Sequence, residues 1–172
     1  MEIPIKDTFF NLDIGCGFNC QEGFKGLDRR KEVNPDFCHD IEDYPWPIED
    51  NSCSIVLASH VIEHLNPKYL IDFFNEAWRI LRPDGNLCIA VPYAGSFGAY
   101  QDPTHTRPGF NEATWLYFTP NHPLWQIYRP KPFFLIEESL VFNHTGNMEV
   151  ILKALKPGSK GITEKEIDAW MS

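Results

Sequence analysis

The feature that most constrains the fold of this chain is an apolar run, residues 9–14, that ends in two glycines, Gly15 and Gly17. A short apolar run is typical of a buried parallel strand, and glycine lets the chain turn sharply and pass close to a ligand. The glycine pair alone does not identify a ligand. Its meaning depends on whether the rest of the chain supplies a parallel sheet and further ligand contacts.

A strand, a helix and a second strand follow in the middle of the chain. Residues 53–58 are apolar and β-branched, as in a buried strand. Asn66 can cap a helix and Pro67 suits its first position, and apolar residues then recur at helical spacing until the turn at 82–85. Residues 87–91 form another apolar run. A strand–helix–strand unit of this kind predicts a parallel sheet.

Both edges of this sheet are expected to depart from a regular alternation of strands and helices. Only about nine residues separate the first strand from the strand-like run at 24–28, fewer than a crossover helix needs. Two strand-like runs at 133–142 and 148–155 flank a turn, which predicts an antiparallel hairpin at a sheet edge. We therefore expect an α/β fold with a Rossmann-like, mostly parallel sheet of about seven strands, an antiparallel edge hairpin and a reduced first crossover helix.

The length of the chain predicts one domain over residues 1–172. Within it, residues 93–132 are rich in proline and aromatic residues and poor in charge, and a long irregular segment is usually functional. We expect a loop insertion on the substrate side, with one short helix at 111–118 and most of its rings in the core. A capping-box pattern at 163–166 predicts a short C-terminal helix.

Composition disfavours several classes of partner. The net charge of −9 argues against a broad phosphate-binding surface, so nucleic acid is not the expected partner. No apolar run approaches the length of a membrane span, and the N-terminus lacks the pattern of a signal peptide. Five scattered cysteines without a C-x-x-C pair indicate reduced thiols. We expect a cytoplasmic protein without membrane contacts, and no feature indicates its oligomeric state.

Three acids stand at the ends of predicted strands or extended segments. Asp13 and Asp28 lie at the ends of the runs at 9–14 and 24–28, and Asp40 lies at the end of a short segment at 33–41 that is expected to be extended. In an open α/β sheet, ligands bind outside the carboxyl ends of the strands. Asp28 can accept both hydroxyls of a ribose, and Asp40 can accept a hydrogen bond from the exocyclic amine of a purine that lies against Ile41. The dinucleotide fingerprint requires a third glycine where this chain has Cys20, so the pattern favours a nucleoside without a pyrophosphate.

Five short motifs follow one another along the chain: LDIGCG at 12–17, GLD at 26–28, DIEDYPWPI at 40–48, SHVIEHL at 59–65 and EAWRILRPDG at 76–85. In this order they make the chain similar to the class I S-adenosylmethionine-dependent methyltransferases, in particular to their compact bacterial and phage members of the methyltransferase-11 type. The resemblance extends over roughly residues 9–110. It implies S-adenosylmethionine as the cofactor and methyl transfer as the reaction.

The resemblance also implies which residues bind the cofactor. Gly15 and Gly17 would approach the methionine moiety, and Asp13 would orient the glycine loop or the methionine amine. Ser59 and His60 would lie near the sulfonium. The complete set of implied cofactor-binding residues is Asp13, Gly15, Cys16, Gly17, Asp28, Asp40, Ile41, Ser59 and His60.

Candidates for the acceptor side follow the strand predicted at 87–91. Methyl transfer from a sulfonium mainly requires alignment of the acceptor with the methyl group, and an oxygen or amine acceptor can also require a base. His105 could accept the proton, Asp102 could orient His105, and Arg107 could bind an anionic part of the substrate. Tyr100 is a further candidate for a substrate contact, and Tyr100 and His122 are weaker alternatives to His105. These residues could also simply form a turn, because Asp-Pro and Arg-Pro pairs are common in turns.

The sequence thus predicts methyl transfer to an oxygen or nitrogen of a small molecule, and two other interpretations stay open. The reduced first helix also fits a protein that binds S-adenosylmethionine or another nucleoside without transfer. In addition, His60, Glu63 and His64 match the H-x-x-E-H pattern of zinc peptidases. Those enzymes need a further carboxylate ligand and a larger domain, so no metal site is expected.

Overall fold

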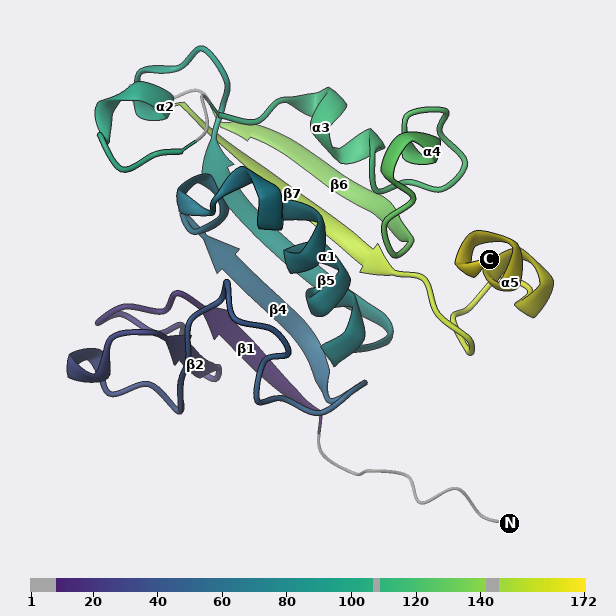
Figure 1. The fold of residues 1–172 in the computed structure, drawn as a ribbon, viewed down its shortest axis with the longest axis horizontal. Helices are drawn as coiled ribbons and strands as arrows, with labels where there is room; N and C mark the ends of the chain where they lie inside the picture. The colour runs from purple at the N-terminus through teal and green to yellow at the C-terminus, as the bar shows by residue number, and fades with distance from the viewer. Residues whose placement is uncertain (1–8, 107–108, 142–145) are drawn as a thin grey trace.

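The computed structural model describes residues 9–106, 109–141 and 146–172. Within these residues, seven strands form one sheet in the order β3-β2-β1-β4-β5-β7-β6 (Figure 1). The strands are β1 (Phe10–Ile14), β2 (Lys25–Asp28), β3 (Phe37–Cys38), β4 (Cys53–Ser59), β5 (Leu81–Pro92), β6 (Phe133–Val141) and β7 (Asn147–Ala154). The strands β1 to β5 run parallel, and β7 is antiparallel to both β5 and β6. The expected Rossmann-like sheet with an antiparallel edge hairpin is confirmed.

The helices are short and lie mostly in the second half of the chain. They are α1 (Leu70–Ile80), α2 (Phe97–Gln101), α3 (Glu112–Leu116), α4 (Trp125–Tyr128) and α5 (Glu164–Met171), with 3-10 turns η1 (Lys31–Val33), η2 (Ile62–His64) and η3 (Pro67–Tyr69). The Asn66 side chain accepts from the Lys68 N–H at 3.2 Å, and Thr163 forms a capping box with Glu166, so both predicted helix starts are confirmed. In the described part of the chain, every helix is too short or too polar to cross a bilayer.

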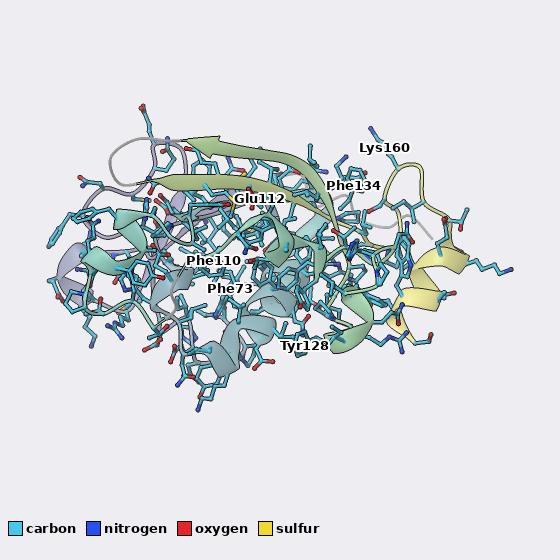
Figure 2. All side chains as sticks on the ribbon, turned by 90° about the horizontal axis from the view of Figure 1, so that it is seen from above. Phe73, Phe110, Glu112, Tyr128, Phe134 and Lys160 are labelled. Carbon is cyan, nitrogen blue, oxygen red and sulfur yellow. The ribbon has the colours of Figure 1, made fainter. Side chains whose placement is uncertain are left out.

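The connection after β1, residues 15–24, contains turns and no helix, as its length predicts. The connection after β2 contains only η1. From β1 the chain steps across the sheet in one direction, to β2 and β3, and from β4 it steps in the other direction, to β5. Because such connections are right-handed, helices in the first set would cover one face of the sheet and helices in the second set cover the opposite face. These two connections therefore leave the first face without helical cover. In Figure 2 the helices α1 and α3 lie on the same side of the sheet.

Alternate residues of the four central strands face α1 and form the core. The core positions, each at most 2% exposed, are Leu12, Ile14, Val56, Ala58, Leu87, Ile89, Val91, Met148, Val150 and Leu152. Phe74 of α1 packs on this layer and stacks against Phe118, with ring centroids 3.8 Å apart. The intervening residues on the opposite face, such as Leu57 and Ile151, are only partly buried. The sheet thus buries one face much more completely than the other.

The aromatic segment at 93–132 contributes to both the core and the surface. Its buried rings, each at most 2% exposed, are Phe110, Trp115, Phe118 and Trp125. Its well-exposed rings are Phe97, Tyr100 and Tyr128. The structure places α3 inside the predicted 111–118 segment and adds α2 and α4, which were not predicted. Helices of four or five residues are too short to show a helical period in the sequence.

Two strands differ from their expected bounds. Only the two residues of β3 pair within the segment expected to be extended at 33–41. The strand β5 begins directly after α1 instead of at 87. Leu81 pairs with Cys53 and the register then shifts, so residues 82–85 bulge out of the ladder. The predicted turn at 82–85, after the helix, is therefore a bulge within the longer strand β5.

Candidate active site

The glycine turn after β1 has a backbone shape that favours glycine. Gly15 and Gly17 have φ of +65° and +55°, a region that other residues adopt only at a steric cost. The Gly15 N–H donates to the Leu27 carbonyl of β2 at 2.7 Å, which holds the turn against the neighbouring strand. A Cβ atom at Gly15 would lie 2.7 Å from Cγ2 of Val61. The turn therefore has no room for a side chain where it faces the start of η2.

Asp28, at the end of β2, is 5% exposed and joins the glycine turn to the next loop. Its Oδ2 accepts from the Gly17 N–H at 3.0 Å and from Arg30 Nη2 at 3.2 Å. Its Oδ1 accepts from the backbone N–H and the Nε of Arg30, at 2.9 and 3.1 Å. Burial opposes ionisation, but the hydrogen bonds from Arg30 and Gly17 hold the pKa of Asp28 below its ordinary value. Arg30 therefore engages both oxygens of an ionised carboxylate.

Asp13, in β1, points to the side of the sheet away from the core. It holds the later part of the connection after β1, at Gln21. Its Oδ2 accepts from the Gln21 N–H at 2.8 Å. Burial raises the pKa of Asp13 above its ordinary value, although the hydrogen bond from Gln21 works in the opposite direction. This contact corresponds to the first of the two roles expected for Asp13, orientation of the glycine loop.

A first cavity, of about 250 Å³, lies between the glycine turn and the end of β4. Five of the expected cofactor residues line it, namely Gly15, Asp28, Asp40, Ile41 and His60. Asp40 Oδ1 accepts from the Glu42 N–H at 3.0 Å, and Asp40 Oδ2 lies 3.9 Å from Arg29 Nη1. Asp40 thus caps its own turn with one oxygen and has the other near Arg29.

A second cavity, of about 500 Å³, adjoins the first at Gly15 and extends over the sheet face that lacks a crossover helix. The expected cofactor residues that line it are Asp13, Gly15, Cys16 and Ser59. Burial raises the pKa of the Cys16 thiol to about 11, so Cys16 is a neutral group in this lining. Gly17 lines neither cavity and acts through its hydrogen bond to Asp28. All the expected cofactor residues therefore lie together at one edge of the sheet.

A third cavity, of about 280 Å³, adjoins the first at His60. Its lining includes Glu63, His64, Gln101, Asp102, His105 and Asn147. Two of the expected acceptor-side residues, Asp102 and His105, are thus in place beside the cofactor residues. Tyr100 is 67% exposed and outside the lining, and Arg107 lies outside the described residues.

Similarity to known proteins agrees with this arrangement. The model of the family described as "Methyltransferase domain" matches residues 17–89. The fold is similar to that of a SAM-dependent methyltransferase from Archaeoglobus fulgidus, with 19% identity and a TM-score of 0.61 over 86% of this chain and 87% of that chain. The family match over residues 17–89 and the fold together indicate a class I S-adenosylmethionine-dependent methyltransferase.

Two further structures with this fold bind the demethylated cofactor. N-methyltransferase NodS from Bradyrhizobium japonicum WM9, in complex with S-adenosylhomocysteine, has 11% identity and a TM-score of 0.61 over 86% of this chain and 79% of that chain. The 1,6-didemethyltoxoflavin-N1-methyltransferase from Burkholderia thailandensis, with bound 1,6-didemethyltoxoflavin and S-adenosylhomocysteine, has 12% identity and a TM-score of 0.60 over 86% and 71%. No protein of curated function matches the sequence. The cofactor and the enzyme class expected from the sequence agree with these matches.

If a ribose binds at Asp28, as the sequence predicts, it must compete with Arg30 for the carboxylate. The Arg30 side chain is 47% exposed, so solvent screens its ion pair with Asp28 and the pair is weak. Replacing Arg30 by alanine is therefore expected to tighten binding of S-adenosylhomocysteine by up to about fivefold. Calorimetric titration of both proteins measures the difference. Weaker binding by Arg30→Ala would show that the guanidinium contacts the ligand instead of competing with it.

On the acceptor side of the methyltransferase, one expected contact is not formed. His105 Nδ1 lies 3.2 Å from the Ala99 carbonyl, which can only accept, so Nδ1 carries a proton and Nε2 is free. Asp102 Oδ1 accepts from the N–H and the hydroxyl of Thr104, at 2.8 and 2.7 Å. Among the described residues, the Asp102 carboxylate makes no hydrogen bond to the imidazole of His105. The backbone of α2, not Asp102, orients that ring.

The H-x-x-E-H segment of the methyltransferase does not place two histidines on one helix face. Its helical part, η2, is a three-residue 3-10 turn, and His60 precedes it with φ of +54°. His60 Nδ1 lies 3.1 Å from Glu63 Oε1, and this hydrogen bond raises the pKa of His60. His64 packs edge-on against His105, with ring centroids 4.8 Å apart. The zinc-peptidase interpretation requires an α-helix here and does not apply.

Several site residues were not assigned from the sequence. Arg30 stands two residues after Asp28, where its backbone N–H can reach a carboxylate, and that spacing is the signal that was available. Glu63 and His64 were visible only as part of a motif for another fold. Thr104 carries no signal of its own, because its role depends on how the loop after α2 is folded.

Proposed function

We propose that the methyltransferase moves the methyl group of S-adenosylmethionine to an oxygen or nitrogen atom of a small polar molecule. The observation that carries this proposal is the third cavity, which adjoins the cofactor residues at His60 and has mainly polar side chains in its lining. Its volume of about 280 Å³ is close to the lower end for ligand pockets, which favours a small acceptor. The net charge of −9 works against a nucleic-acid acceptor.

In this proposal the cofactor lies across the first two cavities. Asp28 accepts the ribose hydroxyls after Arg30 withdraws, and Asp40 accepts the adenine amine while Ile41 lies against the ring. The methionine part follows Gly15 into the second cavity, past Asp13, Cys16 and Ser59. The sulfonium then lies near His60, where the first and third cavities meet.

The chemical step needs few groups. A lone pair of the acceptor forms the bond to the methyl carbon while the carbon–sulfur bond breaks, and the bonding electrons stay on sulfur to give S-adenosylhomocysteine. Alignment of the two reactants supplies most of the rate enhancement. The acceptor proton passes to Nε2 of His105, which the hydrogen bond from Nδ1 to Ala99 leaves free. Residues 93–132 thereby act as the substrate-side insertion of a single domain over 1–172, and Tyr100 and Arg107 stay predicted contacts of the acceptor.

Replacing His105 by alanine is expected to lower kcat by about 100- to 10,000-fold, because general-base catalysis typically contributes that much. The acceptor is first identified by incubating the purified chain with isotopically labelled S-adenosylmethionine and fractionated cell extract, followed by mass spectrometry. His122→Ala is the matched control, because His122 bonds to the backbone of its own loop and lines none of the cavities described above.

Three outcomes would contradict the proposal. Full turnover by His105→Ala would exclude His105 as the base. Label found only in macromolecules would exclude a small acceptor. Binding of S-adenosylhomocysteine without any labelled product would favour a cofactor-binding protein that transfers nothing.

A further inference from the structure

A cluster of potential metal ligands lies in the third cavity. Glu63, His64 and His105 each offer one ligand atom, and these atoms lie within 4.8 Å of one another. Backbone contacts bring together these residues, which lie far apart in the sequence. The N–H of Thr106 donates to the Glu63 carbonyl at 3.0 Å, and its hydroxyl reaches the Glu63 and Leu65 carbonyls. The loop that carries His105 is therefore fastened to η2.

Glu63 is the unusual member of this cluster. It is 0% exposed, and its Oε1 is occupied by His60 Nδ1 at 3.1 Å. Its Oε2 is buried and has no hydrogen-bond partner within residues 9–106, 109–141 and 146–172. A buried carboxylate oxygen without a partner is costly, so such an atom usually faces a hydrogen-bond donor or a cation. Its neighbours in the cluster are two histidines with a nitrogen available.

Hydrogen bonds fix the tautomers of these two histidines. His105 Nδ1 donates to the Ala99 carbonyl at 3.2 Å. The Thr104 hydroxyl donates to Asp102 Oδ1 at 2.7 Å and therefore accepts from His64 Nδ1 at 3.0 Å. In the neutral form, both rings thus carry their proton on Nδ1, and Nε2 is the nitrogen that can bind a metal. His105 donates directly to a carbonyl, and His64 donates through the Thr104 hydroxyl to a carboxylate. Histidines that bind metals characteristically donate their second ring N–H to a carbonyl or a carboxylate in this way.

We propose that Glu63, His64 and His105 bind one divalent transition-metal ion, with zinc the best match. Two imidazoles and one carboxylate suit zinc and related metals better than magnesium or calcium, which prefer oxygen ligands. Ligands at about 2.0–2.1 Å from a tetrahedral zinc lie roughly 3.4 Å apart, so distances of up to 4.8 Å between the ligand atoms must shorten by up to about 1.4 Å. His64 is exposed and His105 partly so, which leaves both rings room to move.

This site differs from the one that the H-x-x-E-H motif suggests. There the two histidines of the motif bind the metal and the glutamate acts as the base. Here His60 is excluded, Glu63 is itself a ligand, and the third ligand comes from His105 in a different loop. Three protein ligands leave a coordination position for another molecule, as in catalytic zinc sites.

The open position would face the third cavity. In the metal-bound form, an acceptor hydroxyl at the open position would have a lowered pKa and could lose its proton to solvent, whereas His105 would act as the base in the metal-free form. This role rests on the proposed function, whereas the metal site itself does not. The test therefore measures metal binding and cofactor binding separately.

The experiment is a calorimetric titration of the chelator-treated full chain with zinc chloride, repeated for His64→Ala, His105→Ala and the control His122→Ala. We expect one equivalent of zinc per wild-type chain and unchanged binding by His122→Ala. Each of the other two variants should bind zinc at least about a hundredfold more weakly. Titration with cobalt(II) should give the intense visible absorption of a four-coordinate site in the wild type and not in these two variants.

S-adenosylhomocysteine binding, measured on the same samples, shows that the variants are folded and that the cofactor site is intact. Absence of zinc binding by the wild-type chain would overturn the proposal. Zinc binding by His64→Ala and His105→Ala with wild-type affinity would also overturn it, because the metal would then lie elsewhere. Failure of cofactor binding alone would count against the proposed function and not against the metal site.

Discussion

Replacing Asp28 by alanine is expected to weaken binding of S-adenosylhomocysteine by at least about a hundredfold. In the proposed complex the carboxylate accepts two ribose hydroxyls, and each hydrogen bond to a charged group is worth about 1.5–3 kcal/mol. The change also removes the acceptor of the Gly17 N–H, so the glycine turn loses one of its hydrogen bonds to β2 and keeps the one from Gly15 to Leu27. Calorimetric titration with the demethylated cofactor measures the effect on affinity without turnover.

Two matched variants separate this effect from loss of charge. Asp28→Asn retains one acceptor oxygen and should bind with an affinity between those of the wild type and Asp28→Ala. Asp43→Ala removes the same charge from an exposed position outside the lining of the cavities described above and should bind like the wild type. Binding by Asp28→Ala within threefold of the wild type would show that the ribose does not lie at Asp28.

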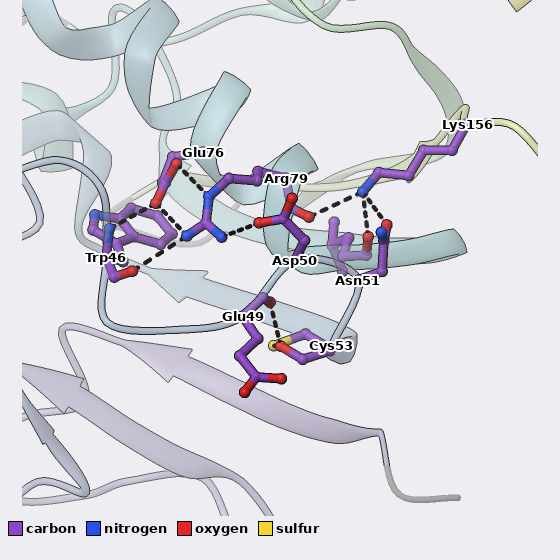
Figure 3. A network of polar contacts seen from close by, with 10 residues as sticks. Trp46, Glu49, Asp50, Asn51, Cys53, Glu76, Arg79 and Lys156 are labelled. Atoms are coloured by element: carbon purple, nitrogen blue, oxygen red, sulfur yellow. Dashed lines mark hydrogen bonds and ion pairs between the residues drawn. The ribbon is translucent and has the colours of Figure 1, made fainter. Parts of the chain in front are cut away.

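Replacing Arg79 by methionine is expected to lower the free energy of unfolding by about 3–5 kcal/mol. Arg79 lies in a polar network at the far end of β4 from the active site (Figure 3). Its Nε and Nη2 donate to the two oxygens of Glu76 at 2.9 and 2.6 Å, and Nη1 donates to Asp50 at 2.5 Å. Glu76 is 7% exposed, so removing the guanidinium leaves a buried carboxylate without its counter-charge.

The exposed partner in the same network is the control. Asp50 is 69% exposed, so Asp50→Asn should cost less than about 1 kcal/mol. Urea unfolding followed by circular dichroism measures both variants. The folded Arg79→Met protein should bind S-adenosylhomocysteine with wild-type affinity, since the network contributes nothing to the cofactor cavities. Equal stability of Arg79→Met and Asp50→Asn would contradict the assignment of Arg79 as the buried counter-charge.

The sheet could be predicted from the sequence because its signals are local. Apolar runs give the central strands, turn residues give the edge hairpin, and the short distance between Ile14 and Phe24 rules out a first crossover helix. The short helices α2 and α4 could not be predicted, since four or five residues show no helical period. The excursion at 82–85 depends on the register between β4 and β5, which no local pattern encodes.

The clustering of the candidate cofactor residues was predictable for a topological reason. Carboxyl ends of parallel strands meet at one edge, so Asp13 and Asp28 had to lie near the glycine turn. The partners of these acids were not predictable, because they come from loops. Arg30 engages Asp28, Gln21 engages Asp13, and Ala99 takes the place expected for Asp102 beside His105. A sequence shows which residues can bind ligands or transfer protons, but it does not show the path of an irregular loop.

The most direct test of the cofactor site is a crystal structure of the methyltransferase with S-adenosylhomocysteine. We predict ribose hydroxyls on the Asp28 carboxylate in place of Arg30, the adenine amine at Asp40, and the sulfur near His60 at the mouth of the third cavity. A ligand bound elsewhere on the sheet, or an Arg30–Asp28 pair that stays intact with the ribose at another residue, would contradict the assignment.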